Sequence, residues 1–355
     1  MNVLVTGAAG FIGSYIARNL IGSGVNVVGI DNFNDYYLRS CKEFNIDLIN
    51  KHAGNPISSN SDVIQVYEVL SGYYPSNGGP KGEFHFYEGD VRDFAFLESV
   101  FSAHKIDKVI HLAAMAGVPL SEKKPRLYTE VNVDGTVNLL NLSVQHSVSR
   151  FVFGSSSSVY GNREDRKVTE EDDISKPASV YGASKVAGEV LSHSFYKMFG
   201  LSIMIVRIFG PIYGPLQRPY GMFHQRAINF VHNNKELQIY GKKGLDTAKD
   251  STYIDDEVNG IIACLNCDYD FEVFNIGTSY PLPIRTWIDS IEKAFNKKAL
   301  YKVVTIDKGD VVSSASIEKA QKMLTYNPLM DMYEGVRRQV EIFKLMPKWY
   351  QEMEV

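Results

Sequence analysis

The sequence predicts an α/β fold, in which a doubly wound parallel sheet carries a smaller C-terminal α+β lobe. Strand-like apolar runs alternate with amphipathic helix patterns as far as residue 209, the order that builds a parallel sheet with helices on both faces. From Gly210 onward the alternation fails, because Gly and Pro crowd a short span and short strands mix with helices. We therefore expect a first domain at residues 1–209 and a lobe at residues 210–355 that is discontinuous and partly returns to the first domain.

The first unit of this fold lies at the start of the sequence. A short apolar strand runs into the glycine-spaced turn Gly7–Gly13, a helix pattern follows, and a second apolar strand ends at Asp31. Glycines let a backbone approach a pyrophosphate closely, and a helix N-terminus offers free amides to it. An acid at the tip of the second strand suits a ribose diol and repels a 2′-phosphate. The unit thus predicts a Rossmann-type domain that binds NAD rather than NADP, against the alternative of a tight turn without a ligand.

The remaining elements follow from the same periodicities. In the first domain we expect strands at Phe84–Glu88, Lys108–Leu112, Arg150–Ser155 and Ile203–Ile208, and helices at Phe94–His104, Pro125–His146 and Tyr181–Phe199. In the lobe we expect strands at Leu237–Tyr240, Val273–Ile276 and Tyr301–Thr305, and helices at Phe223–His232, Asp255–Leu265 and Thr286–Phe295. Asp90 follows a predicted strand, where its carboxylate either accepts the adenine amino group or caps the next helix.

One segment breaks this rhythm. Residues 39–82 are polar and rich in turn residues, and within them only Val63–Leu70 alternates enough to predict a short strand. A connection of this length is usually a functional lid or an inserted hairpin. We place this insertion over or beside the edge of the cofactor.

Composition limits the classes of partner. The chain has 355 residues and a net charge of -4 without long runs of one sign, which argues against nucleic-acid and membrane partners. There is no signal-peptide pattern, no apolar run of transmembrane length and no disulfide framework, so we expect a cytoplasmic protein. Cys264 and Cys267 have metal-like spacing, but they end an apolar helix pattern, which favours buried thiols over metal or redox use.

The sharpest chemical pattern is the pair Tyr181 and Lys185. Four residues apart on a helix, the two side chains point the same way, and an ammonium beside a phenol lowers the pKa of that phenol. A phenolate poised near neutral pH is a general base for a hydroxyl group. The serine run Ser155–Ser158 ends a predicted strand and is poor core material, so a polar pocket floor is favoured. A surface pair is the alternative interpretation of Tyr181 and Lys185.

Together these motifs resemble the extended short-chain dehydrogenase/reductase superfamily, and within it the nucleotide-sugar 4-epimerases, in the form typical of UDP-glucuronate 4-epimerases. The resemblance covers nearly the full length. It rests on the turn and pair above and on Asp31–Tyr37, His111–Ala114, Asn132–Thr136, Val159–Gly161, Arg207–Phe209, Tyr213–Pro215 and Thr252–Asp256.

The resemblance implies NAD-dependent 4-epimerisation of a UDP-sugar, foremost UDP-glucuronate to UDP-galacturonate, through a transient 4-keto sugar. The alternative is a related enzyme: a UDP-glucose or UDP-GlcNAc 4-epimerase, a decarboxylase, a 4-ketoreductase or a dehydratase. The 4,6-dehydratases carry Asp-Glu where this chain has Ser157 and Ser158, and the decarboxylases carry Glu at Ser158, which argues against both. The resemblance also implies a homodimer formed through the helices at Pro125–His146 and Tyr181–Phe199.

The resemblance also assigns site residues. The implied catalytic residues are Ser156, Tyr181 and Lys185, with Ser156 on the sugar O4 and Lys185 on the nicotinamide ribose. The implied cofactor residues are Gly7, Gly10, Phe11, Ile12, Gly13, Asp31, Asn32, Asp90, Val91, Leu112, Ala113, Ala114, Asn132, Tyr181 and Lys185. The implied substrate residues are Ser156, Ser157, Ser158, Arg218, Tyr240, Lys249 and Asp310, and no metal is expected.

The substrate half departs from the family pattern. Pro119 and Lys249 stand where these epimerases usually have arginine. At Lys249, an ammonium therefore replaces a guanidinium fork at an expected diphosphate contact. Arg218 either clamps a diphosphate or hexuronate carboxylate or is a surface residue of a Pro-rich loop. We assign no catalytic role to His111, His193 or His224.

Overall fold

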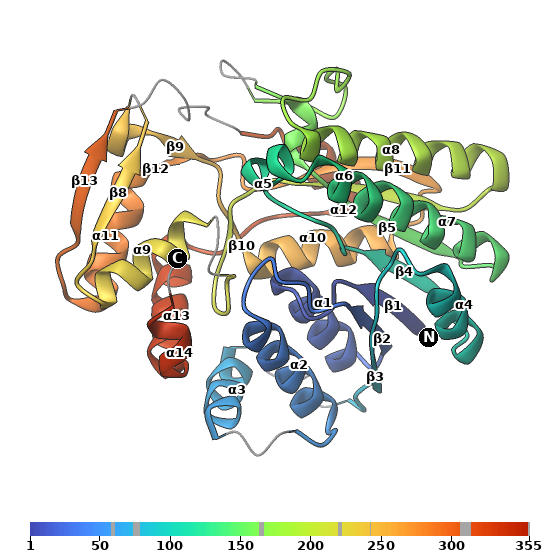
Figure 1. Ribbon diagram of the computed structural model, residues 1–355, viewed down its shortest axis with the longest axis horizontal. Coiled ribbons are helices and arrows are strands. Elements are labelled where there is room, and N and C mark those ends of the chain that lie inside the picture. The colour runs from blue at the N-terminus through green and yellow to red at the C-terminus, as the bar shows by residue number, and fades with distance from the viewer. Residues whose placement is uncertain are drawn as a thin grey trace.

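A seven-stranded parallel sheet forms the centre of the protein (Figure 1). The computed structural model describes residues 1–57, 61–73, 79–162, 167–218, 222–241, 243–305 and 314–353. The strand order is β11-β6-β5-β4-β1-β2-β3. The strands are β1 (Asn2–Thr6), β2 (Asn26–Asp31), β3 (Phe84–Glu88), β4 (Lys108–His111), β5 (Arg150–Ser156), β6 (Ile203–Ile208) and β11 (Phe271–Ile276). The predicted fold class is confirmed.

Helices cover both faces of the sheet. One face carries α1 (Phe11–Gly22), α2 (Arg39–Ala53) and α10 (Ile254–Asn266), and the other carries α4 (Phe94–Ala103), α7 (Gly135–Gln145) and α8 (Val180–Phe199). Strand β1 shows why two layers form. Val3 and Val5 pack into the core on the α1 side, whereas Leu4 packs into the core on the α4 side, as the alternation of a strand dictates.

The chain leaves β1 in one direction to β2 and β3, and then returns to β4 on the other side of β1. In open α/β sheets the crevice for ligands lies beyond the carboxyl ends of the strands at such a reversal. The ends of β1, β2, β4 and β5 carry Gly7, Asp31, Leu112 and Ser156 to this edge.

The smaller lobe lies beside this edge. Its extended pairs are β8 (Glu236–Tyr240) with β13 (Leu300–Val304), β9 (Ala248–Lys249) with β12 (Leu282–Pro283), and β7 (Ile212–Tyr213) with β10 (Thr252–Tyr253). Its helices are α9 (Phe223–His232), α11 (Ile284–Phe295), α13 (Met332–Leu345) and α14 (Lys348–Gln351). Helix α12 (Glu318–Leu324) instead packs on β11 and α10 of the first domain. Two short 3-10 turns, η2 (Ser157–Tyr160) and η3 (Gly244–Asp246), complete the connections near the sheet edge and in the lobe.

The described parts of the insertion, residues 39–57, 61–73 and 79–82, contain two helices, so the short strand predicted at Val63–Leu70 is wrong. The two helices are α2 and α3 (Ser61–Tyr73). Val63, Val66 and Leu70 are all buried, and their spacing of three and four residues is that of a helix face. Burial of this apolar face stabilises the helix. The alternation that predicted a strand extends over only eight residues and is therefore a weak indication of secondary structure.

The predicted strand at Val273–Ile276 is real, but its assignment to the lobe is wrong. It forms the edge strand β11 of the central sheet, with Val273 opposite Ile205 of β6. Phe274 and Ile276 are fully buried, because α10 returns the chain to the first domain and covers this strand.

The helix expected at Pro125–His146 has an interrupted form. It comprises α6 (Pro125–Thr129), the π-helical turn η1 (Glu130–Asp134) and α7, preceded by the short α5 (Val118–Lys123). Single π turns within helices often mark functional sites. Here the turn carries Asn132, which the sequence placed near the cofactor.

Cys264 is buried near the end of α10, and Cys267 is partly buried just beyond it, as the sequence predicted. Among the described residues, no three His, Cys, Asp or Glu side chains group in a way that could hold a metal ion. No helix in the described part of the chain is long and apolar enough to cross a membrane.

Candidate active site

A cavity of about 900 Å³ lies between the carboxyl edge of the sheet and the lobe. Its sheet side is lined by the glycine turn, the ends of β2, β4 and β5, and the start of α8. Its lobe side is lined by Arg218, Met222, Phe223, Lys249 and Trp287. The volume suits a large ligand, because sites for small molecules span roughly 300–1,000 Å³.

The glycine turn leaves no room for side chains. Gly7 has φ +73°, and a Cβ there would stand 3.0 Å from the Ala113 nitrogen. A Cβ on Gly13 would stand 2.2 Å from the Gly7 carbonyl oxygen, inside any real contact distance. Strand, turn and α1 therefore pack backbone on backbone, and the N-terminus of α1 opens toward the cavity. This arrangement fits the pyrophosphate of a dinucleotide.

Asp31 ends β2 with its side chain almost buried. It accepts a hydrogen bond from the Phe33 amide at 2.9 Å, and its Oδ1 lies 3.6 Å from the Lys42 Nζ. Burial raises the pKa of Asp31, and the Lys42 ammonium opposes that rise. Lys42 also lines the cavity, so a lysine stands beside the predicted acid at the end of β2.

The two interpretations of Asp90 are settled in part. Helix α4 is capped by Asp93, whose carboxylate accepts from the Phe96 amide at 3.0 Å, so Asp90 is not that cap. Asp90 accepts from Asn32 Nδ2 at 2.9 Å and from Arg92, and these hydrogen bonds, those of Arg92 foremost, lower its pKa to about 2. Of the described residues around it, Val91 lines the cavity and Asp90 does not.

Ser156 and Tyr181 meet at the cavity floor. Ser156 caps the turn that follows β5, accepting from the Ser158 amide at 3.2 Å, and Tyr181 opens α8 behind its cap Ser179. Both side chains line the cavity with Ser157 and Ser158. The sequence therefore correctly placed a polar floor at the end of β5.

The expected lowering of the Tyr181 pKa is not what the structure gives. Burial raises the pKa of the phenol, while hydrogen bonding from Ser156 and the positive charge of Arg218 act against the rise. Lys185 Nζ instead donates to the Gly154 carbonyl at 2.8 Å, and burial lowers the pKa of Lys185 to about 8. The sequence argument weighed the charge of Lys185 and omitted the desolvation of the phenol.

A buried ion pair supports this floor. Arg207 of β6 contacts Glu189 of α8 at 2.8 Å, and both side chains are only 5% exposed. Ser155 donates to the same carboxylate, and Tyr160 accepts from Arg207 at 2.8 Å. Glu189 lies one turn beyond Lys185, and its charge raises the pKa of Lys185 against the effect of burial.

Arg218 is partly buried and lines the cavity, which favours the clamp over the surface interpretation. Its guanidinium carbon lies 4.9 Å from the centre of the Tyr36 ring, and its charge acts on Tyr181. Lys249 and Pro119 also line the cavity. The positions where this chain departs from the family pattern thus lie in the walls of the site.

Three of the predicted residues that the structure describes do not line the cavity: Asp90, Tyr240 and Asn132. Tyr240 is 44% exposed on β8 and is not among the described residues that line the cavity. Asn132 is buried behind the wall, where it bonds the Met115 backbone at 2.7 and 3.0 Å and Ser184 at 2.9 Å. Asp310 lies outside the described residues.

Several lining residues were not predicted from the sequence: Asn34, Tyr36, Tyr37, Lys42, Met222, Phe223 and Trp287. The first three belong to the Asp31–Tyr37 motif, in which only Asp31 and Asn32 were expected to bind the cofactor. Lys42 lies on α2, which was expected to be a loop. No periodicity marked Trp287, since it reaches the cavity from α11 in the lobe.

The three histidines that were set aside have different environments. His111 is buried between Thr6 and Thr136, 2.7 and 3.0 Å away, which is a structural role. His193 packs against the Phe271 ring outside the cavity. His224 lines the cavity, its ring 4.3 Å from that of Trp287, and burial lowers its pKa to about 3, so the imidazole is neutral.

Comparison with known proteins gives a consistent set of relatives. The model of the NAD dependent epimerase/dehydratase family matches residues 3–277. UDP-glucuronate 4-epimerase of Thermodesulfobacterium geofontis is 35% identical over 340 residues, covering 95% of this chain and 94% of that protein. UDP-glucuronate 4-epimerase 1 of Arabidopsis thaliana is 32% identical over 367 residues, covering 99% and 76%. The crystal structure of UDP-glucuronic acid 4-epimerase from Bacillus cereus with UDP-glucuronic acid and NAD matches with a TM-score of 0.81 and 32% identity, covering 98% of this chain and 100% of that one.

Proposed function

The chain belongs to the NAD-dependent epimerase/dehydratase family, and from this membership we propose that it converts UDP-glucuronate to UDP-galacturonate by NAD-dependent 4-epimerisation. One observation carries the proposal. A single cavity holds a glycine turn built for a dinucleotide at one end and Ser156, Tyr181 and Arg218 at the other. In this proposal residues 1–209 form the NAD-binding domain, and residues 210–355 form the nucleotide-sugar lobe that returns α10 and β11 to it.

The residues of the cavity divide the work between cofactor and sugar. Gly7, Gly10 and Gly13 would receive the pyrophosphate, and Asp31 the adenosine ribose, with Lys42 beside it. Lys185 would hold the nicotinamide ribose. When bound, NAD supplies a reversible acceptor for a hydride from the sugar C4.

The chain's own part in the reaction is to move one proton. Tyr181 takes the proton from the sugar O4 and later returns it, while Ser156 holds that oxygen by a hydrogen bond. Arg218 would stabilise the phenolate by its charge, and its guanidinium would bind a carboxylate or diphosphate of the substrate. Ser157 and Ser158 stand where the dehydratases carry an acid and a base, so this chain lacks the groups that would eliminate water from the sugar. The decarboxylases carry Glu at the position of Ser158, so the sugar should also keep its C6 carboxylate.

Product analysis tests this function. Purified protein incubated with UDP-glucuronate is expected to form UDP-galacturonate, with no CO2 released and no net NADH. Release of CO2 would show a decarboxylase and accumulation of NADH a dehydrogenase. Turnover of UDP-glucose alone would move the assignment to a neutral-sugar epimerase.

Arg218→Gln is expected to lower kcat at neutral pH by about tenfold. The Arg218 charge lowers the pKa of Tyr181, so its removal raises that pKa and leaves less phenolate at a given pH. The rising limb of kcat against pH should therefore move to higher pH, and activity should recover there. Arg218→Lys keeps the charge and should leave the limb nearly in place. Equal profiles for both variants and the wild type would contradict this role.

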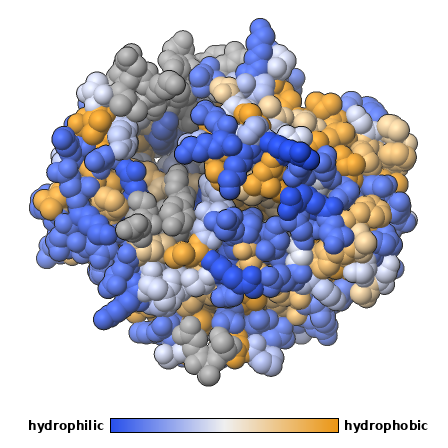
Figure 2. Space-filling view, in the orientation of Figure 1, coloured by the Kyte–Doolittle hydropathy of each residue, from blue (hydrophilic) through white to orange (hydrophobic). Residues whose placement is uncertain are grey.

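We also propose a homodimer and a cytoplasmic location. Val190, Met198 and Phe199 of α8 expose 59%, 71% and 52% of their surface, and Figure 2 shows apolar side chains gathered on the side where α7 and α8 lie. Exposed apolar patches often mark protein interfaces. Light scattering is expected to give twice the chain mass, and a monomer mass would contradict the dimer. Three unpaired cysteines support a reducing compartment.

A further inference from the structure

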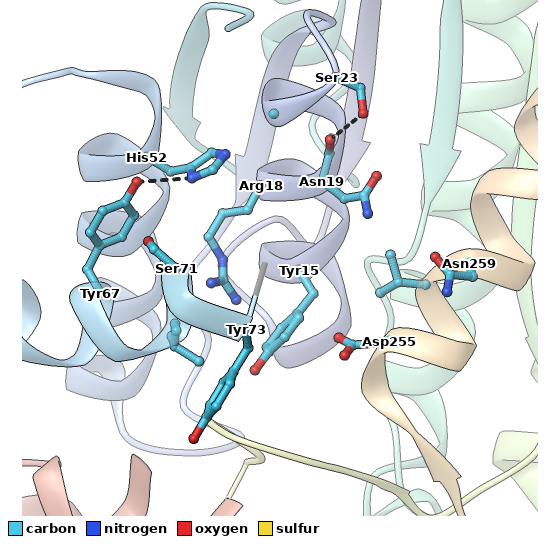
Figure 3. Close-up of a pocket in the computed structure, with 13 residues that line it drawn as sticks. Tyr15, Arg18, Asn19, Ser23, His52, Tyr67, Ser71, Tyr73, Asp255 and Asn259 are labelled. Atoms are coloured by element: carbon cyan, nitrogen blue, oxygen red, sulfur yellow. Dashed lines mark hydrogen bonds between the residues drawn. The ribbon is translucent and has the colours of Figure 1, made fainter. Parts of the chain in front are cut away.

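A second cavity, of about 410 Å³, lies away from the first (Figure 3). It is enclosed by α1, α2, α3 and α10, so one of its walls is the helical insertion. None of the described residues that line it lines the proposed active site. Its mouth is formed by exposed residues at Asn19, Ser23 and Asn259, so it is open to solvent.

Arg18 is the central feature of this cavity. Its side chain is only 8% exposed, and its guanidinium stacks on the Tyr15 ring at 4.3 Å. Nε donates a long hydrogen bond of 3.4 Å to the Ser14 carbonyl, whereas Nη2 is buried with no partner among the described residues. A buried guanidinium N–H without an acceptor is costly, and native proteins rarely leave one. Arg18 thus places a guanidinium group with an unsatisfied, buried N–H in the wall of the cavity, beside the space that a ligand would occupy.

The other walls indicate what else the ligand carries. In Figure 3, Arg18 lies between Ser71 and Tyr73 of α3 on one side and Asp255 and Asn259 of α10 on the other. These hydroxyl, amide and carboxylate groups suit a ligand with hydroxyl groups of its own. His52 Nδ1 forms a hydrogen bond with the Tyr67 hydroxyl, 3.2 Å away. Burial lowers the pKa of His52 to about 4, so its imidazole is neutral near pH 7 and adds no charge to the cavity.

We propose that this second cavity binds a small polyhydroxylated anion, a sugar acid or sugar phosphate without a nucleotide, whose anionic group pairs with Arg18. The volume is less than half that of the first cavity, which suits a monosaccharide better than a nucleotide sugar. The carboxylate of Asp255 lies on the opposite wall, where it would accept from ligand hydroxyls and repel a second anionic group. The ligand therefore carries one anionic end and one neutral end.

The site is connected to the proposed active site through shared elements. Helix α1 carries Gly13 in one cavity and Arg18 in the other, and α2 carries Lys42 in one and His52 in the other. The Tyr15 hydroxyl also donates to the Pro215 carbonyl at 2.9 Å, three residues before Arg218. The binding proposal does not depend on this connection or on the reaction assigned above.

Calorimetric titration of the full-length protein tests the proposal. The protein is first saturated with NAD and UDP-glucuronate and brought to equilibrium, so that the first cavity is occupied at both its cofactor end and its sugar end. It is then titrated with D-glucuronate, D-glucose 6-phosphate and D-glucose. At least one of the two anions is expected to bind with one site per chain, and D-glucose at least tenfold more weakly. The two anion arms distinguish a carboxylate ligand from a phosphate ligand.

Matched variants locate the site. Arg18→Gln should weaken anion binding by about tenfold to a hundredfold. Ser71→Phe, which fills the cavity and keeps the arginine, should abolish binding. Arg126→Gln, whose side chain is 92% exposed elsewhere, should bind as the wild type does. Circular dichroism establishes that each variant is folded. The proposal is overturned if neither anion binds, if D-glucose binds as tightly, or if folded Arg18→Gln and Ser71→Phe both keep wild-type affinity.

Discussion

Tyr181→Phe is expected to lower kcat by about a thousandfold and to leave NAD binding unchanged. The substitution removes only the hydroxyl that exchanges a proton with the sugar O4. The ring stays packed, 6.2 Å from the Tyr128 ring, and Lys185 keeps its hydrogen bond to the Gly154 carbonyl. The cavity therefore keeps its shape and its cation, and only the proton acceptor is lost.

The measurement is single-variant kinetics with UDP-glucuronate, together with quantification of NAD released on denaturation. Tyr196→Phe provides a control on the same helix, because that ring stacks on Phe271 at 5.1 Å outside the cavity. It should keep kcat within about twofold. Turnover of Tyr181→Phe near the wild-type level would contradict the proposed mechanism.

Local signals in the sequence predicted the sheet well. Each expected strand of the first domain appears within one or two residues of its predicted bounds. Most of these strands are buried on both faces, so each of those is a short apolar run between turn residues that can be recognised without tertiary information. The edge strand β3 is partly exposed and shows alternation instead. The glycine turn could also be predicted from the sequence, because the spacing of its glycines reflects the backbone contact between Gly7 and Gly13.

The predictions from the sequence fail where contacts between distant segments determine the structure. The insertion buries Val63, Val66 and Leu70, but its polar composition hid the helical period. Strand β11 belongs to the sheet only because it pairs with β6, some sixty residues earlier in the chain. A parallel pairing of this kind leaves no mark on either strand alone.

In the candidate site, too, the residues of local motifs were predicted correctly, whereas properties that depend on distant segments were not. Motif residues of the sheet edge, such as Ser156 and Tyr181, lie in the cavity as expected. Tyr240 does not, because it lies on the exposed face of β8, which pairs with β13 in the lobe. The pKa of Tyr181 was expected to fall, whereas burial raises it, since desolvation depends on the whole fold.

Gly13→Ala is the second substitution with a large expected effect, here on the cofactor site itself. The added Cβ would stand 2.2 Å from the Gly7 oxygen and 2.9 Å from the Gly7 carbonyl carbon. Both are backbone atoms of the turn, so no side chain can rotate away to make room. The turn must therefore shift relative to α1. The Gly7 amide resists this shift, because it donates a hydrogen bond of 2.8 Å to the Ile30 carbonyl.

The expected cost is about 2–3 kcal/mol in the free energy of unfolding, as for overpacking in a core. NAD affinity should fall at least a hundredfold, because the amides that receive the pyrophosphate no longer converge. Urea unfolding and NAD titration measure the two effects separately.

Gly72→Ala is the matched control, since it makes the same change within a helix. A Cβ on Gly72 meets no described atom within 4 Å, so α3 should gain up to about 1 kcal/mol of stability and NAD affinity should not change. If Gly13→Ala bound NAD as tightly as Gly72→Ala, the close packing of the turn would not be what holds the cofactor. The dinucleotide site would then have to be assigned to other residues of the cavity.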